Sequence, residues 1–183
     1  MNEKRESWDN YFMGLAEMVS TRATCDRKSV GTIIVKDRRV IASGYNGSIK
    51  NLEHCSSPEK YYACKKCGKE FDSIPDFPHA LSCAGYGYEE MHGGHIMIDN
   101  HCQRTVHSEL NALLSAARFG VPLDGSTMYC TTFPCWNCFK SIVSAGIVEL
   151  IYKEEYGESE DNKLVLTAAK KLETFGAIKL RKL

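Results

Sequence analysis

The chain has 183 residues, of which 43% are hydrophobic and 25% are charged, a length and composition typical of one globular domain. Lysine and arginine together number 23, as do aspartate and glutamate, so no net charge draws the chain to nucleic acid or to an anionic membrane. The charged start, MNEKRESW, predicts neither a signal peptide nor a membrane span, so we expect a cytoplasmic protein. Several of its nine cysteines lie near histidines or at C-x-x-C spacing, so metal binding explains them better than disulfides do.

The first part of the chain predicts a helix followed by a β-hairpin. Apolar side chains recur at helical spacing from Trp8 to Thr21, and Ser7 precedes them as a potential cap. Residues 30–35 and 40–43 form two strand-like runs, the first of them rich in β-branched side chains. The charged residues 36–39 between these runs indicate the turn of a hairpin.

A glycine-containing segment, Gly44 to Ser48, follows the second strand. Its glycines allow the backbone to bend sharply or to approach a ligand closely. From local chemistry alone, the pair Asn46-Gly47 indicates a turn. Residues 50–105 then interrupt the pattern, because they contain cysteines, histidines and turn residues but little periodicity.

The remainder of the chain alternates helices and strands. We predict helices over residues 108–119, 135–145 and 161–175, and strands over residues 126–131, 148–153 and 177–181. Because single helices separate these strands, the crossovers should be right-handed and the sheet largely parallel. The predicted fold class is therefore α/β, a single domain with a three-layer α/β/α sandwich. Its five-stranded mixed sheet contains the hairpin as an antiparallel pair.

Two motifs at predicted helix starts offer the ligands of a catalytic zinc ion. His107 stands at the entry of one helix, and Cys135 and Cys138 lie in the first turn of the next, where a proline precedes them. Three protein ligands leave the fourth position of zinc open for water, and Glu109 is left to move protons. The partial positive charge of a helix N-terminus favours the thiolate form of cysteine.

The two motifs are much more specific together than apart. A lone C-x-x-C pair is more often a structural zinc site, a redox pair or a chance match, and a lone H-x-E means little. In this order, H-x-E followed by P-C-x-x-C resembles the signature of zinc-dependent nucleobase deaminases.

The chain further resembles the deoxycytidylate (dCMP) deaminases of the cytidine deaminase superfamily, most of all the bacterial and phage forms. The resemblance covers nearly the whole chain except about residues 56–93. It rests on four segments, which are Ser29-Val30-Gly31, Gly44-Tyr45-Asn46-Gly47, Arg104-Thr105-Val106-His107-Ser108-Glu109-Leu110-Asn111-Ala112 and Pro134-Cys135-Trp136-Asn137-Cys138.

This resemblance implies a cytidine deaminase-like fold and the zinc-dependent hydrolysis of dCMP to dUMP and ammonia, which supplies the precursor for dTMP synthesis. Glu109 is implied as the residue that takes a proton from water, protonates N3 of cytosine and then protonates the departing amine. The resemblance also places Asn46 near the sugar, in place of a role as a turn residue only. It further implies a homo-oligomer, commonly a hexamer, with activation by dCTP and Mg²⁺ and inhibition by dTTP.

The substrate phosphate needs cationic or hydrogen-bonding partners. Arg27 and Lys28, just before the first strand, and Tyr156, after the fourth, are the candidates. Each of them also has an ordinary alternative as a surface residue.

The segment outside the resemblance contains a second set of metal-ligand residues. Cys64 and Cys67 have zinc-knuckle spacing with a glycine after the second cysteine, and His79 and Cys83 follow. A long loop without secondary structure is uncommon in a compact domain unless something ties it down. We therefore predict a structural zinc in an insertion at about residues 56–93; the alternative is a loop with free thiols.

A third set is Cys25, Cys55, His95 and His101, with His92 and Cys102 as substitutes. The resemblance implies a non-catalytic zinc between the corresponding segments of bacterial and phage relatives. Histidine stands at position 95, where similar sequences can have cysteine, and is an equally acceptable zinc ligand.

Two other functions compete with dCMP deamination. A related enzyme could act on cytidine, dCTP or a base in RNA, although RNA editing usually goes with a basic surface that this chain lacks. Alternatively, the zinc knuckle could make the chain a protein-docking or nucleic-acid-binding module on an inactive deaminase scaffold. The acidic and aromatic residues of the insertion suit protein better than DNA.

Overall fold

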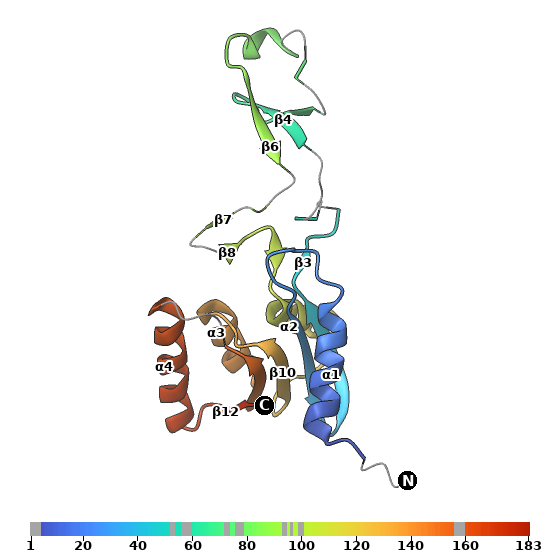
Figure 1. Ribbon diagram of the computed structural model, residues 1–183, viewed down its shortest axis with the longest axis vertical. Helices are drawn as coiled ribbons and strands as arrows, with labels where there is room; N and C mark the ends of the chain where they lie inside the picture. The colour runs from blue at the N-terminus through green and yellow to red at the C-terminus, as the bar shows by residue number, and fades with distance from the viewer. Residues whose placement is uncertain are drawn as a thin grey trace. The chain divides into compact units, whose positions relative to one another are not determined.

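The computed structural model contains two compact units, one formed by Met1–Gly47 with Thr105–Leu183 and the other by Ser48–Arg104 (Figure 1). The insertion predicted at about residues 56–93 lies within the second unit. The structure describes residues 5–51, 54–55, 60–71, 74–75, 79–92, 95, 97–98, 101–155 and 160–183. Within these ranges, no helix has the length and apolar character that crossing a bilayer requires.

The first unit is built on a five-stranded mixed sheet with the order β12-β11-β10-β1-β2. Its strands are β1 (Gly31–Lys36), β2 (Arg39–Tyr45), β10 (Thr127–Thr132), β11 (Glu149–Glu154) and β12 (Lys179–Lys182). β1 and β2 form the predicted hairpin. Asp37 and Arg38 at its turn both have positive φ, 50° and 60°, which is the backbone of a type I′ turn and matches the twist of the strands.

The sheet is less parallel than the alternation of helices and strands predicts. β10 pairs parallel with β11, and β11 with β12, but β1 is antiparallel to both of its neighbours, β2 and β10. The crossover that contains α2 (Ser108–Arg118) does return the chain in the direction of β2. However, β10 joins the sheet beside β1 instead of beside β2, and a crossover fixes strand direction without fixing the neighbour.

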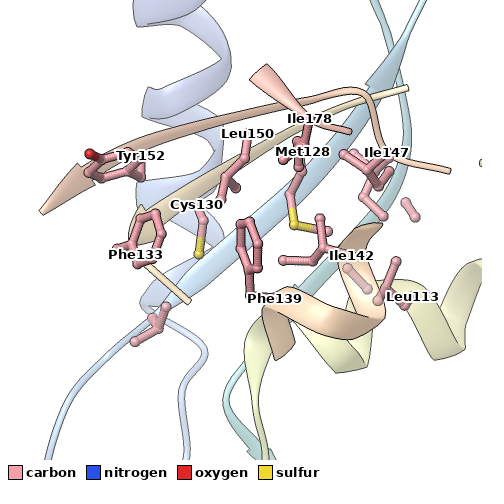
Figure 2. Close-up of a cluster of buried hydrophobic side chains, with 14 of the residues drawn as sticks. Leu113, Met128, Cys130, Phe133, Phe139, Ile142, Ile147, Leu150, Tyr152 and Ile178 are labelled. Carbon is pink, nitrogen blue, oxygen red and sulfur yellow. The ribbon is translucent and has the colours of Figure 1, made fainter. Parts of the chain in front are cut away.

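Helices cover both faces of this sheet. In the described residues the α-helices are α1 (Trp8–Ser20), α2, α3 (Trp136–Ser144) and α4 (Glu160–Thr174), whose ends lie within one residue of the predicted ones. Phe12 of α1 packs on one face with Ile33. Figure 2 shows the opposite face, where Phe139 of α3 lies beside Met128 and Cys130 of β10, and this cluster also includes residues of α2 and α4. The three-layer α/β/α sandwich is therefore confirmed.

The second unit contains short strands where the sequence shows little periodicity. β4 (Lys60–Cys64) pairs antiparallel with β5 (Glu70–Phe71) and β6 (Tyr88–His92), and a 3₁₀ turn, η1 (Leu81–Cys83), precedes β6. β7 (Met97–Ile98) pairs with β8 (His101–Cys102). The chain divides between the two units at residues 47/48 and 104/105, and at these two points β3 (Gly47–Ser48) pairs with β9 (Thr105–Val106). Strands of two to five residues are too short to show a clear alternation in sequence.

Helix α2 packs directly on the backbone of β2 at Gly44. A Cβ atom on Gly44 would lie 2.3 Å from the carbonyl oxygen of Ser108 and 2.4 Å from the amide nitrogen of Ala112. Both neighbours are backbone atoms and cannot move aside as a flexible side chain does. Glycine is therefore required here for the approach of a helix, and not for the approach of a ligand, which was the other possibility.

Gly44→Ala is expected to destabilise the protein because a methyl group must push α2 away from the sheet. Overpacking of this kind typically lowers the free energy of unfolding by about 1–3 kcal/mol. Urea denaturation followed by circular dichroism measures the change.

Gly14→Ala is the matched control, since Gly14 is an exposed position within α1 where an added methyl group would have no atom within 4 Å. Alanine is the better helix former there, so the control should be neutral or stabilise the protein by up to about 1 kcal/mol. Equal stability of Gly44→Ala and the unaltered chain would contradict the close packing of α2 on β2.

Candidate active site

The three residues predicted as catalytic zinc ligands meet at the N-termini of two helices. His107 is the residue before α2, Cys135 is the residue before α3, and Cys138 lies in the first turn of α3. The Nδ1 atom of His107 lies 3.5 Å from each of the two sulfur atoms. Zinc bonds of about 2.1 Å to nitrogen and about 2.3 Å to sulfur place tetrahedral N and S ligands about 3.6 Å apart. The three side chains therefore fit one zinc ion and leave a fourth position open.

The loop before α3 is held in place by the core. β10 ends at Thr132, and the chain then passes through Phe133, whose amide donates to the carbonyl oxygen of Glu154 at 2.7 Å. The Phe133 ring packs edge-on against Tyr152, with ring centroids 4.8 Å apart. The cysteines thus follow the carboxyl end of a strand in the parallel part of the sheet, the usual place for a ligand site in an open α/β fold.

The two cysteines have opposite pKa shifts because they share a proton. A hydrogen bond from the Cys138 thiol lowers the pKa of Cys135, and His107 lowers it further. The same contact with Cys135, together with burial, raises the pKa of Cys138. Metal ligation requires the thiolate form, so Cys135 is already suited to it, and Cys138 would have to give up its proton when a cation binds.

Glu109 is a buried carboxyl group in the first turn of α2. Its side chain belongs to a residue that is only 5% exposed, and burial raises its pKa. A carboxyl group whose pKa moves from its ordinary value towards neutrality can both accept and return a proton. The position two residues after His107 places this group on the same helix start as a metal ligand.

A chain of hydrogen bonds leads from the sheet to Glu109. The hydroxyl of Ser108 donates to Oε2 of Glu109 at 2.9 Å, so the Ser108 oxygen must accept from Thr32, also at 2.9 Å. The Thr32 hydroxyl has one hydrogen, which it donates to Ser108, so it accepts a hydrogen bond from the thiol of Cys130 at 3.1 Å. Burial raises the pKa of Cys130 to about 12, which keeps that proton on sulfur. All three polar groups behind the carboxylate are fully buried.

Sequence patterns alone did not identify Thr32 and Cys130. The two residues are direct partners in the antiparallel pairing of β1 and β10, where Thr32 lies opposite Cys130. They are nearly a hundred residues apart in the chain, and the neighbour relation of β1 and β10 is the part of the topology that the sequence did not reveal. The contact between Thr32 and Cys130 could be predicted only if the order of the strands in the sheet were known.

The predicted substrate residues have different surroundings. Asn46 is buried, and its side chain accepts from the amide of Val30 at 2.8 Å and donates to the carbonyl oxygen of Lys28 at 2.7 Å. The Lys28 ammonium forms an ion pair with Glu154 at 3.4 Å. Arg27 is exposed. Tyr156 lies outside the described residues.

The other predicted ligands form further groups in the second unit. The ligand atoms of Cys64, Cys67, His79 and Cys83 all lie within 4.8 Å of one another. Separately, the sulfur of Cys102 lies 3.6 Å from the sulfur of Cys55 and 3.4 Å from Nδ1 of His95.

Cys102, which the sequence offered only as a substitute, therefore joins two of the predicted ligands of the third set. The side chains of the preferred His101 and of His92 lie outside the described residues. Cys25 is buried and belongs to the first unit, and its participation stays a prediction. All nine cysteines are free of disulfide bonds.

The family profile described as "Cytidine and deoxycytidylate deaminase zinc-binding region" matches residues 6–154, a range that includes His107, Glu109, Cys135 and Cys138. ComE operon protein 2 of Bacillus subtilis is 39% identical over 153 residues, which cover 84% of this chain and 62% of that protein. The deoxycytidylate deaminase of Mycobacterium phage D29 is 35% identical over 151 residues, which cover 82% of this chain and 98% of the phage protein.

Among solved structures, the dCMP deaminase of cyanophage S-TIM5, in complex with dCMP and dUMP, has the same fold. The TM-score is 0.60 at 24% sequence identity, with 99% of this chain and 100% of that chain covered. The chain spans 62% of the Bacillus protein and 43% and 44% of the two yeast deoxycytidylate deaminases.

A double-mutant cycle on Thr32→Val and Cys130→Ala tests the hydrogen-bond chain. Each single change leaves a buried partner without its hydrogen bond, at a typical loss of about 1–3 kcal/mol in the free energy of unfolding. The double variant removes both partners together, so its loss should be smaller than the sum, with a coupling of about 0.5–3 kcal/mol.

Thr32→Val combined with Thr174→Val is the control, because the Thr174 hydroxyl donates to the carbonyl oxygen of Lys170 within its own helix. That pair should be additive to within about 0.5 kcal/mol. Additive losses in the Thr32 and Cys130 cycle would show that the two groups do not act as one chain.

Proposed function

The chain belongs to the family of cytidine and deoxycytidylate deaminases, and we propose that it hydrolyses dCMP to dUMP and ammonia. The observation that carries the proposal is the meeting of His107, Cys135 and Cys138 beside the buried carboxyl group of Glu109. This is the donor set and the spare acid–base residue of zinc-dependent nucleobase deaminases. It supports catalysis over the alternative of a docking module on an inactive scaffold.

His107, Cys135 and Cys138 would hold the catalytic zinc, with distances that suit a tetrahedral site. Zinc supplies a water ligand of lowered pKa, and hence a hydroxide nucleophile at neutral pH. Two thiolates and a neutral imidazole balance the charge of the ion, so a neutral base can enter the site without a large electrostatic penalty.

Glu109 would manage the protons of the reaction. It takes a proton from the attacking water as the new C4–O bond forms, and it gives that proton to N3 of the ring. It then takes the second proton of the former water and delivers it to the amino group as the C4–N bond breaks, so that ammonia leaves and uracil remains. The hydroxyl of Ser108 holds Oε2 of Glu109 during these steps and leaves the other carboxylate oxygen for the substrate.

Recognition of a nucleotide requires groups around the sugar and the phosphate. Asn46 is proposed near the sugar because its bonds to Val30 and Lys28, counted among the described residues, use one donor and one acceptor of the amide and leave one of each. Arg27, Lys28 and Tyr156 are proposed as phosphate partners. Lys28 would have to exchange its ion pair with Glu154, an exposed pair of the kind that contributes little to stability.

The names of relatives support dCMP over other cytosine substrates, and the phage D29 protein is matched over nearly its full length. Family resemblance also leads us to propose a cytoplasmic homo-oligomer, with a hexamer favoured, that is activated by dCTP with Mg²⁺ and inhibited by dTTP. Light scattering, and turnover of dCMP with and without each nucleotide, test these properties.

Glu109→Gln is expected to bind zinc as well as the unaltered chain but to lose most of its turnover, because glutamine cannot carry protons. General acid–base groups contribute about 10²–10⁴-fold to rate, so the rate of ammonia release from dCMP should fall by about 10²-fold or more. Zinc content is measured on the same samples. Glu17→Gln, a change to an exposed carboxylate that pairs with Lys153, should leave both quantities unchanged. Ammonia release from Glu109→Gln near the original rate would refute the proton-transfer role.

A panel of dCMP, dCTP and cytidine tests the substrate. Loss of the contacts to a charged phosphate costs about 1.5–3 kcal/mol for each hydrogen bond, so kcat/KM for cytidine should be at least about tenfold lower than for dCMP. A preference for cytidine or dCTP would leave the deaminase assignment intact and overturn the choice of dCMP.

A further inference from the structure

The hairpin turn between β4 and β5 presents two cysteines in the manner of a zinc knuckle. The amide of Gly68 donates to the carbonyl oxygen of Cys64 at 2.8 Å, and the amide of Cys64 donates to that of Lys69 at 3.0 Å. Gly68 has φ of 72°, a conformation that favours glycine. Backbone amides of Lys66 and Cys67 donate to the Cys64 sulfur, which supports a thiolate there.

Two further ligands reach this turn from residues 79–83. The Nε2 atom of His79 lies 3.2 Å from the sulfur of Cys67, and Cys83 ends the 3₁₀ turn η1. All four ligand atoms lie within 4.8 Å of one another. Three sulfurs and one imidazole nitrogen are a Cys₃His set, and four protein ligands close the coordination sphere, as in structural zinc sites.

The imidazole of His79 is oriented by a second layer of contacts. Its Nδ1 atom lies 3.3 Å from the hydroxyl of Tyr88, and its ring packs against Phe71 with centroids 5.0 Å apart. When Nε2 is the ligand atom, Nδ1 carries the proton and donates a hydrogen bond to the hydroxyl of Tyr88. Such a hydrogen bond fixes the tautomer and ring orientation of metal-binding histidines.

Few apolar side chains are buried in the described part of residues 60–92. Among its described side chains, the buried hydrophobic ones are Ala63, Cys64 and Cys83, at 7%, 2% and 7% exposure. Folded segments shorter than about 40 residues usually need a disulfide, a metal or a partner. Disulfides are not formed here, and two of these three buried residues, Cys64 and Cys83, belong to the four grouped ligands.

Three lysines lie in or beside the turn that carries Cys64 and Cys67. Three thiolates with one Zn²⁺ ion leave a net charge of −1, and Lys65, Lys66 and Lys69 lie in or beside the turn. The ammonium of Lys66 donates to the carbonyl oxygen of Ser82 and lies 4.6 Å from the centre of the Tyr86 ring. Lys66 therefore connects the two ligand-bearing segments and also offsets their charge.

We propose that Cys64, Cys67, His79 and Cys83 bind a structural zinc ion that organises residues 60–92. This ion is separate from the zinc proposed at His107, because each site has its own ligands. The site does not need substrate or turnover, so its test is independent of whether the chain deaminates dCMP.

Metal analysis of the purified full-length chain tests the ligands one at a time. Cys67→Ser and His79→Ala should each lower the zinc content by one ion per chain. His79→Cys keeps four ligands and should retain the content of the unaltered chain, as should Lys65→Ser, a change at an exposed non-ligand position in the same turn. Unchanged zinc content in both Cys67→Ser and His79→Ala would overturn the proposal.

Hydrogen–deuterium exchange on the unaltered chain gives a second test that does not depend on the folding of a variant. Removal of zinc by a chelator should expose the amides of β4 and β6 to exchange while those of β10 and β11 stay protected. Protection of β4 and β6 that survives complete removal of zinc would contradict an organising role for the metal.

Tyr88→Phe addresses the orienting contact, since it removes only the hydroxyl. Loss of such outer contacts typically weakens metal affinity by about 10–100-fold, so a competing chelator should take this zinc at a correspondingly lower concentration. Equal resistance to the chelator would remove Tyr88 from the site and leave the four ligands to be judged by the metal analysis.

Discussion

The packing of α2 on β2 at Gly44 is the contact on which the arrangement of the active site depends. At this point backbone meets backbone, with no side chain between the helix and the strand. The contact fixes where α2 begins, and therefore where His107 and Glu109 point. The other half of the site follows β10, so the first unit's sheet sets the distance between the imidazole and the two thiols.

Burying a carboxyl group beside these ligands is unfavourable unless hydrogen bonds offset the loss of water. The run of donors from Cys130 through Thr32 and Ser108 provides that offset, and its members come from β10, β1 and the first residue of α2.

The two units differ in the side chains that they bury. In the first, Phe139, Met128, Leu150 and other apolar side chains fill the space between sheet and helices, and the polar groups of the site are exceptions within a hydrophobic interior. In the described part of residues 60–92, two of the three buried hydrophobic residues are cysteines that belong to the group of candidate metal ligands. With zinc bound at both proposed sites, a change in available zinc would act on the second unit through folding and on the first through chemistry.

Much of the fold could be predicted from the sequence where local patterns decide the structure. The helices have apolar residues at regular spacing, glycines follow α2, α3 and α4, and the hairpin has a charged turn, so the predicted ends lie close to those observed. The neighbour of β1 could not be predicted, because a crossover helix fixes the direction of the next strand but not its place. This one gap also concealed the contact of Thr32 with Cys130. The strands of the second unit were missed for another reason, since runs of two to five residues are too short to show a clear alternation. The spacing of cysteines and histidines could group ligands, yet it could not rank Cys102 against His101, which are adjacent in sequence.

The formation of dUMP and ammonia from dCMP, before and after zinc is removed and restored, tests the central claim most directly. A site of three ligands and one buried carboxyl group predicts one ammonia for each dUMP, loss of turnover in the metal-free chain and recovery when zinc returns. Turnover at an undiminished rate in the metal-free chain, or no dUMP from the zinc-loaded chain, would contradict the account.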